Sequence, residues 1–280
     1  MTFRVAQISD THLSERHPGF TANFDALVEH LRAAKPDLVV HTGDVSAHGE
    51  LAGDDLRFAK RKLDAMGMDY LAIPGNHDVG NDPGLGETPA NAERLARWKD
   101  VFGHDHFVRD VPGWRLIGLD TLITTTDLPE AEAQFQNLAC ALEGAEGRSA
   151  GLFLHKPLCE EAMAEEVITY WSVQPGPRRR MLDLLAEYPP AFVASGHVHQ
   201  WRDRGVVEGL RQVWAPATAF IVGDTWQHRT AGAGKPVGYV EHLLHADGRH
   251  ECRLVQPAGM ATHDLGLLPG IYAPMRRLAA

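Results

Sequence analysis

Side chains that bind metal ions or transfer protons follow five apolar runs of this sequence. They are Asp10 and His12 after residues 3–9, Asp44 after 37–43, Asn76 and His77 after 70–75, His155 after 151–154, and His197 and His199 after 191–196. Carboxylate and amide oxygens and imidazole nitrogens are all metal donors, and histidine also exchanges protons near neutral pH. One kind of chemistry repeated after five runs predicts a single site to which all five contribute.

The spacing of these residues favours a centre with two metal ions. Asp10 and His12, like His197 and His199, are two residues apart, so an extended chain points both side chains to the same side. Asp44 has two carboxylate oxygens that can bridge two ions, and ions roughly 3.5–4 Å apart are the usual clamp for displacement at phosphorus. A donor set of nitrogen and oxygen without sulfur suits manganese, iron, zinc or cobalt better than a thiolate site or a calcium site.

Strands and helices that position these residues are also predicted by the sequence. Apolar, β-branched runs predict strands over 3–9, 37–43, 70–75, 114–120, 151–155 and 191–196, and helical spacing predicts helices over 24–35, 54–67, 130–144 and 178–188. This alternation is typical of an α/β domain with a partly parallel sheet, in which sites form at the carboxyl ends of strands. Gly43, Gly75 and Gly196 precede three of the candidate positions and permit a sharp turn with close backbone approach.

The organisation of the chain changes after residue 200. Short strands follow one another there, and Asp-Gly within 246–249 predicts a hairpin, so we expect a second, antiparallel set of strands beside the first. No linker separates the halves, which favours one domain over 1–280 whose strand-rich C-terminal part is 201–280. The turn-rich stretch 79–113 predicts an insertion over the strand ends, near the site.

Charge and composition limit the partners and the location. The formal net charge of −10 disfavours a broad grip on duplex nucleic acid, so we expect a small-molecule partner. The three cysteines are unclustered and suit a reducing compartment, no apolar run approaches membrane-spanning length, and residues 1–12 lack the form of a signal peptide. These features predict a cytoplasmic protein without a membrane partner, and they leave a homo-oligomer open.

The order and form of the motifs resemble one known superfamily. Asp10-x-His12, Gly43-Asp44, Gly75-Asn76-His77-Asp78, a strand-end His155 and Gly196-His197-x-His199 occur in the order of the calcineurin-like metallophosphoesterases. The length and the Gly-Asn-His-Asp and Gly-His-Val-His forms are similar to the bacterial cyclic-nucleotide and glycerophosphodiester phosphodiesterase branch. The resemblance covers about residues 3–200, as the quoted motifs delimit it. It implies a four-layer αββα sandwich of two facing mixed sheets flanked by helices.

The resemblance also implies roles for the candidate residues. The first metal ion would be held by Asp10, His12, Asp44 and His199, and the second by Asp44, Asn76, His155 and His197. His77, with Asn76, would contact the substrate, and His77 would assist the leaving group. The nucleophile would be a hydroxide that bridges the ions. The charges of two divalent ions, two aspartates and one hydroxide would sum to +1. This net positive charge would attract a singly charged diester.

These implications predict metal-dependent hydrolysis of a small phosphodiester, either a cyclic nucleotide or a glycerophosphodiester. A phosphomonoesterase or a nucleotide-sugar pyrophosphatase on the same metal core is the alternative within the class, and a non-catalytic scaffold is the alternative from another class. Residues 43–50 carry no arginine after Gly-Asp, unlike the protein-phosphatase branch. That absence counts against a phosphoprotein phosphatase.

Several other residues invite a functional interpretation that the sequence does not favour. His104 and His106 repeat the His-x-His spacing but follow no predicted strand, so we expect them not to be ligands. We expect His41 to pack within its strand, and His48 to line the pocket. The remaining expectations are a solvated helix start for 178–180, a small apolar filler at Cys159 and packing roles for Trp171 and Trp201, although either tryptophan could instead face a substrate.

Overall fold

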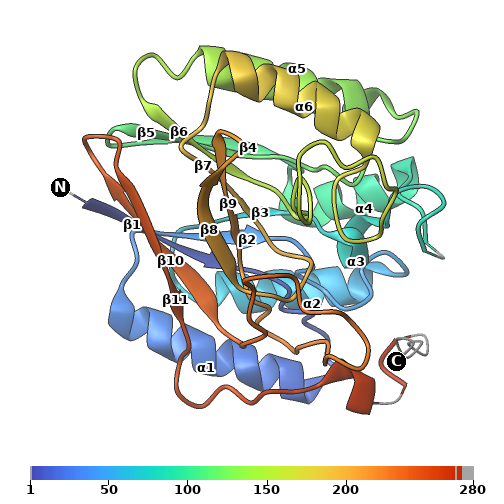
Figure 1. Cartoon of the computed structure of the whole chain (residues 1–280). Helices are drawn as coiled ribbons and strands as arrows, with labels where there is room; N and C mark the ends of the chain where they lie inside the picture. The colour runs from blue at the N-terminus through green and yellow to red at the C-terminus, as the bar shows by residue number, and fades with distance from the viewer. Residues whose placement is uncertain (1, 87, 269, 273–280) are drawn as a thin grey trace.

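Two mixed β-sheets lie face to face, with helices on both outer faces, as Figure 1 shows. The computed structural model describes residues 2–86, 88–268 and 270–272. The first sheet has the strand order β11-β10-β1-β2-β3 and the second has the order β4-β5-β6-β7-β9-β8. This arrangement confirms the predicted four-layer sandwich.

The strands are β1 (Thr2–Ile8), β2 (Leu38–Thr42), β3 (Tyr70–Ile73), β4 (Phe107–Val111), β5 (Trp114–Gly118), β6 (Ser149–Phe153), β7 (Phe192–Ser195), β8 (Arg202–Val207), β9 (Leu210–Trp214), β10 (Tyr239–His245) and β11 (His250–Val255). The helices are α1 (Pro18–Ala34), α2 (Gly53–Asp64), α3 (Asn76–Val79), α4 (Ala92–Phe102), α5 (Pro129–Glu143), α6 (Pro175–Glu187) and the short 3₁₀ helix η1 (Leu265–Leu267). All six strands and all four helices predicted from the sequence are present.

The core has three layers, one between the two sheets and one on the outer face of each sheet, because side chains alternate between the two faces of each strand. Val5 of β1 packs into the interface between the sheets, where it belongs to one cluster with Trp114 and Phe192 of the second sheet. Its neighbour Ala6 and then Ile8 pack on the opposite face, against α1 and α2. Successive side chains of a strand point to opposite faces, so a strand with a layer on both sides is apolar throughout. The outer face of the second sheet is covered in the same way by α5 and α6.

The strands that precede the candidate residues run in parallel within each sheet. In the first sheet β2 pairs in parallel with β1 and β3, and in the second sheet β6 pairs in parallel with β5 and β7. Parallel neighbours end at the same edge of a sheet, so the loops after β1, β2 and β3, and those after β6 and β7, emerge together. The candidate residues are carried by two sheets and not by one.

The C-terminal strands differ from the prediction, because they do not form a separate set. The β8–β9 hairpin joins the second sheet, where β9 pairs in parallel with β7. The β10–β11 hairpin joins the first sheet, where β10 pairs antiparallel with β1. Each hairpin thereby pairs with a strand at the edge of an existing sheet. This pairing satisfies backbone groups of that edge strand that would otherwise be unpaired.

The stretch 79–113 is more regular than the sequence suggests. It contains the eleven-residue helix α4 and the strand β4, which forms an edge of the second sheet by pairing antiparallel with β5. Helix α1 begins six residues before the predicted start, because Pro18 supplies the fixed φ that suits a first helical turn. No helix among the described residues is long and apolar enough to cross a membrane.

Candidate metal centre and active site

The eight predicted site residues converge where the strand ends of the two sheets meet. Asp10 and His12 follow β1, Asp44 follows β2, Asn76 and His77 begin α3 directly after β3, His155 follows β6, and His197 and His199 follow β7. Three groups of side chains have donor atoms within 4.8 Å of one another: Asp10, His12 and His199; His12, Asp44 and His77; and Asp44, His155 and His197. The groups share residues, so they form one continuous cluster.

One end of this cluster is formed around His199. Its Nε2 atom lies 3.3 Å from Oδ1 of Asp10 and 3.4 Å from Nε2 of His12. Nε2 of His12 in turn lies 3.7 Å from Oδ2 of Asp44. These donors correspond to the set that the resemblance implies for the first ion.

The other end is formed around His155. Its Nε2 atom lies 3.4 Å from Oδ1 of Asp44, 3.2 Å from Nδ1 of His197 and 3.1 Å from Oδ1 of Asn76. Asp44 therefore presents one oxygen to each end of the cluster. This is the placement expected of a carboxylate that bridges two ions.

The chemistry of the donors fits metal ions. Oδ1 of Asp10 is buried and has no hydrogen-bond partner in the described structure, although an unpaired buried carboxylate oxygen is costly. A cation there would satisfy this oxygen together with the nitrogens of His12 and His199. All donors are oxygen or nitrogen, a set that suits zinc, iron, manganese or cobalt.

The outward-facing nitrogens of the histidines are also held in place. Nδ1 of His155 bonds the carbonyl of Thr42 at 2.8 Å, and Nδ1 of His199 bonds the carbonyl of Phe220 at 2.8 Å. Nε2 of His197 bonds the carbonyl of Tyr170 at 2.9 Å. A carbonyl only accepts, so each of these nitrogens carries a proton, and the opposite nitrogen is the one that faces the cluster and could bind an ion.

Backbone strain is concentrated at the same positions. Eight non-glycine residues of the described chain have positive φ, and five of them are candidate ligands: Asp10, His12, Asp44, His197 and His199. Such conformations cost about 1–3 kcal/mol each and persist where the surrounding structure enforces them. Concentrated strain of this kind is typical of a functional site.

Close backbone approach explains the glycines before the candidate residues. A Cβ atom at Gly196 would lie 1.8 Å from Oγ of Ser9 and 2.6 Å from Oδ2 of Asp10. One at Gly75 would lie 2.2 Å from Oδ1 of Asp44. The predicted close approach is therefore present, and the carboxylates of the cluster occupy the space that a side chain would need.

Asp78 fixes the loop that carries Asp44. Its Oδ2 atom accepts the backbone N–H groups of Val45 and Gly75, and its Oδ1 atom accepts that of Ser46. Burial, and then the charge of Asp44, raise the pKa of Asp78 to about 7. The carboxyl group therefore holds the turns after β2 and β3 together.

His77 lies beside the cluster, grouped with His12 and Asp44. Its backbone N–H donates to Oδ1 of Asp44 at 2.8 Å, and its Nδ1 bonds the carbonyl of Ala47 at 3.1 Å. Its ring lies 4.9 Å from the ring of His12. Burial lowers the pKa of His77, although Asp44 opposes this shift.

Electrostatics at His155 differ from those at the other cluster histidines. Burial acts to lower the pKa of His155, but the charge of Asp44 and the hydrogen bond to it prevail and raise the pKa to about 9. At His12 and His197, burial prevails and holds the pKa well below its usual value. His155 is thus the histidine on which Asp44 acts most strongly.

Two tyrosines reach the cluster from segments without a sequence signal. The hydroxyl of Tyr170 accepts a hydrogen bond from Nδ2 of Asn76 at 3.1 Å, and the hydroxyl of Tyr272 lies 2.6 Å from Nδ1 of His12. Neither follows a predicted strand, and neither belongs to a motif. Tyr170 lies in the long loop 156–174, and Tyr272 lies near the end of the chain.

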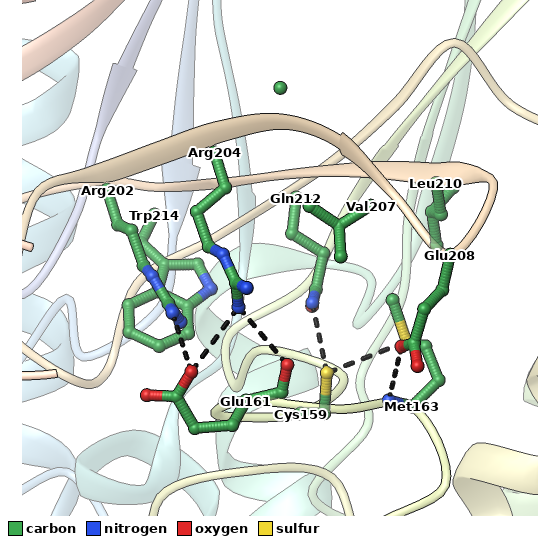
Figure 2. Close-up of a pocket in the computed structure, with 11 residues that line it drawn as sticks. Cys159, Glu161, Met163, Arg202, Arg204, Val207, Glu208, Leu210, Gln212 and Trp214 are labelled. Atoms are coloured by element: carbon green, nitrogen blue, oxygen red, sulfur yellow. Dashed lines mark hydrogen bonds and ion pairs between the residues drawn. The ribbon is translucent and has the colours of Figure 1, made fainter. Parts of the chain in front are cut away.

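The loop that carries Tyr170 is tied to the β8–β9 hairpin, as Figure 2 shows. Both Arg202 and Arg204 pair with the carboxylate of Glu161, at 3.0 and 3.3 Å. Nε2 of Gln212 donates to Sγ of Cys159 at 3.1 Å, and burial raises the pKa of that thiol to about 11. The cavity drawn in Figure 2 is therefore a region that anchors this loop to the hairpin, and Cys159 is buried within it.

The other histidines lie as the sequence suggests. Nε2 of His41 bonds Thr11 within the core, and His106 bonds Asp105 and Asn137, away from the cluster. His48 lies beside the candidate site, with its ring 5.3 Å from that of Tyr272.

Arg178 departs from its predicted role, whereas Trp171 lies in one of the two places that the sequence left open. Arg178 is buried and donates to the carbonyls of Leu158 and Val173, so the prediction of a solvated helix start holds only for its two neighbours. The polar carbonyls of the loop draw its guanidinium inward. The ring of Trp171 lies 5.7 Å from that of His197, so this residue lines the site as well as packing. Trp201 pairs with Gly234 through backbone hydrogen bonds.

Two relatives of this chain are named as probable phosphodiesterases. A protein of Arcobacter nitrofigilis named probable glycerophosphodiester phosphodiesterase GpdQ is 28% identical over 212 residues, which is 70% of this chain and 71% of that protein. A protein of Moraxella catarrhalis named probable cyclic nucleotide phosphodiesterase is 34% identical over 87 residues, which is 30% of each chain.

Solved structures confirm the fold and a family model identifies the family. A dimetal phosphatase from Danio rerio matches with a TM-score of 0.59 at 15% identity, over 91% of this chain and 99% of that one. A purple acid phosphatase from yellow lupin matches with a TM-score of 0.64 at 17% identity, over 94% of this chain and 53% of that one. The calcineurin-like phosphoesterase model matches residues 3–201, from β1 to the last His-x-His motif. The chain therefore belongs to the calcineurin-like phosphoesterase family.

Proposed function

We propose that this protein hydrolyses a small phosphodiester with a centre of two metal ions. The observation that carries the proposal is the position of Asp44, which presents Oδ2 to His12 and Oδ1 to His155 between the two ends of the donor cluster. The names of the two relatives, which refer to glycerophosphodiesters and cyclic nucleotides, support a diester substrate. Either a cyclic nucleotide or a glycerophosphodiester fits the proposal.

The residues of the cluster divide into two ligand sets in this proposal. Asp10, His12, Asp44 and His199 hold one ion, and Asp44, Asn76, His155 and His197 hold the other. Two bound ions supply positive charge for the phosphoryl oxygens and lower the pKa of water so that it becomes a nucleophile. Manganese, iron, zinc and cobalt all suit these donors.

The chain's own groups complete the site. His77 lies beside the cluster and is anchored through its backbone and its Nδ1 atom, so its Nε2 atom is the one that donates a proton to the departing oxygen when the ring is in its imidazolium form. The amide of Asn76 can also contact a phosphoryl oxygen of the substrate. Two aspartates in the ligand sets, with an amide in place of a third carboxylate, leave net positive charge for an anionic diester.

Two further features of the chain support this proposal. The strands after residue 200 complete both sheets, which supports a single domain over 1–280. Specificity for the leaving group is assigned to the segments around the cluster, namely 79–113, the 156–174 loop and the chain beyond 200. Tyr170 of the loop and Tyr272 beyond residue 200 both reach the candidate ligands, which supports this assignment.

A comparison of substrates tests the proposal. The manganese-loaded protein should hydrolyse glycerophosphodiesters or cyclic nucleotides with a higher kcat/KM than the matching monoesters or a nucleotide-sugar pyrophosphate. A preference for the monoester or the pyrophosphate would replace the proposal with the alternative on the same metal core. Fewer than one ion per chain after metal loading, with no hydrolysis of any ester, would indicate a scaffold.

A further inference from the structure

The outward nitrogens of the site histidines follow a pattern with one exception. His77, His155, His197 and His199 each direct the outward nitrogen to a backbone carbonyl. His12 alone directs its outward Nδ1 to a side chain, the hydroxyl of Tyr272, at 2.6 Å. A carbonyl is held by the fold, whereas this hydroxyl comes from a residue 260 positions along the chain.

Tyr272 is packed against the site. Its ring centroid lies 4.6 Å from that of His77, 5.3 Å from that of His48 and 5.7 Å from that of His12. It also belongs to an apolar cluster that includes Phe20, Phe220, Val222, Leu265 and Leu268. The ring therefore has a defined place beside the end of the cluster formed by Asp10, His12 and His199.

The segment before Tyr272 is bonded to the loop after β9. The backbone N–H of Ile221 donates to the carbonyl of His263, and the N–H of Leu265 donates to the carbonyl of Ile221. Oδ1 of Asp264 accepts the backbone N–H of Gly223 at 3.1 Å. The same loop supplies Phe220, whose carbonyl holds His199, so two candidate ligands of the first ion are oriented by neighbouring segments.

We infer that Tyr272 is a positioning residue for the first metal ion, an inference that rests on the proposed metal centre. With Nε2 of His12 facing Asp44 and His199, Nδ1 carries the proton and donates to the hydroxyl oxygen of Tyr272. This hydrogen bond fixes the tautomer and the ring orientation of His12 and increases the basicity of Nε2. Loss of such an outer hydrogen bond typically lowers metal affinity or activity about 10–100-fold.

The test measures Mn²⁺ binding in single-site backgrounds of the full-length protein. His197→Ala removes a ligand of the second ion, and His199→Ala removes a ligand of the first. Tyr272→Phe deletes only the hydroxyl and retains the ring contacts. We expect it to weaken Mn²⁺ binding about 10–100-fold in the His197→Ala background, and to leave binding unchanged in the His199→Ala background.

The controls separate positioning from a general structural effect. Tyr70→Phe removes the hydroxyl that donates to Asp64 at 2.7 Å, far from the candidate ligands, and should leave Mn²⁺ binding unchanged in both backgrounds. Equal Mn²⁺ affinity with and without Tyr272→Phe in the His197→Ala background would overturn the inference. Equal weakening of Mn²⁺ binding by Tyr272→Phe in both backgrounds would also overturn the inference, because the effect would then not depend on the ion that His12 binds. Inactivity of the wild-type protein on every diester would instead contradict the proposed function, without changing these affinities.

Discussion

The backbone N–H of His77 donates to Oδ1 of Asp44 at 2.8 Å, which joins the proposed general acid to the proposed bridging carboxylate. His77 is therefore placed by its main chain, while its side chain is held separately through Nδ1. The same carboxylate faces His155 with Oδ1 and His12 with Oδ2. A change at Asp44 or at His77 should consequently have different and separable effects.

Replacing Asp44 should affect both ions. In Asp44→Asn, one carboxylate oxygen becomes an amide nitrogen that cannot bind a cation, and the oxygen that remains loses its negative charge, so donors at both ends of the cluster are weakened. We expect a loss of bound metal from both sites and nearly complete loss of activity, measured by metal analysis and by turnover of a diester. Asp54→Asn, an exposed change in α2, is the control. Wild-type metal content together with wild-type turnover in Asp44→Asn would refute the bridging assignment.

Replacing His77 should retain both ions and affect the leaving group. A general acid contributes about 10²–10⁴-fold, and an alkoxide needs this help whereas a nitrophenolate needs little. In His77→Ala we expect a loss of that size on an alkyl diester and a much smaller loss on an aryl diester, compared as kcat at saturating substrate.

The control for His77 is His48→Ala, a nearby histidine whose hydrogen bond goes to His17. It should change both substrates by the same small factor. Equal losses on the two diesters in His77→Ala would assign the residue to phosphate positioning, and loss of metal would make it a ligand.

The site could be anticipated because its residues follow strands in a regular way. An apolar run that ends in glycine and then a metal-binding side chain is a local signal, and it recurs at Asp44, Asn76 and His197. The signal does not reveal which strands share a sheet. Local periodicity therefore predicts one group of strands that the structure distributes over two sheets, because strand pairing depends on contacts distant in sequence.

Residues outside these runs were missed for a physical reason. Tyr170 and Tyr272 lie in segments with no helical or strand periodicity, so nothing local indicates which way their side chains point. Their positions result from contacts made far along the chain, such as those of Glu161 with Arg202 and of Asp264 with Gly223. Arg178 was misassigned for the same reason, since the loop carbonyls that accept its hydrogen bonds are not adjacent in the helix.

The histidine pair between the sheets should make stability depend on pH. His250 stacks on Phe192 with 3.9 Å between centroids, and its Nε2 lies 2.9 Å from Nδ1 of His242. Burial, and then the cation of Arg211, lower the pKa of His250 to about 3. Above the unfolded-state pKa of about 6.5, His250 is neutral in both the folded and the unfolded chain, so its contribution to stability is fully present. As the pH falls from there toward 3, only the unfolded chain gains this proton, so stability falls.

This group alone should contribute about 1.4 kcal/mol of lost stability per pH unit below about pH 6. Urea unfolding of metal-free protein between pH 7 and pH 4 measures the slope. His250→Gln should reduce the slope relative to wild type, and the exposed His104→Gln should not. A wild-type slope in His250→Gln would show that this side chain does not remain neutral in the folded protein.

The buried cation next to His155 should be essential for stability. Nζ of Lys156 lies 2.6 Å from Oδ2 of Asp82 and 2.6 Å from Oδ1 of Asn81, and the side chain of Lys156 is 1% exposed. Removing one partner leaves the other charge buried, which costs about 3–5 kcal/mol. We expect a loss of that size for Lys156→Met in the free energy of unfolding. The double variant Lys156→Met/Asp82→Asn should recover most of it, and a double variant no more stable than Lys156→Met would contradict the charge argument.

The pairing of β1 with β10 has a consequence for synthesis on the ribosome. In this pairing, residues Thr2 to Gln7 of β1 lie beside His245 to Val240 of β10. The first strand to be synthesised must therefore wait for this neighbour until β10 has been synthesised. At about 5–20 residues per second, that wait is on the order of 10–50 seconds, during which one edge of β1 has no native neighbour. The candidate ligands likewise extend from Asp10 to His199, so a nascent chain cannot assemble the metal centre until most of it has been translated. A metal ion held by the full set of candidate ligands would therefore report that translation has passed β7.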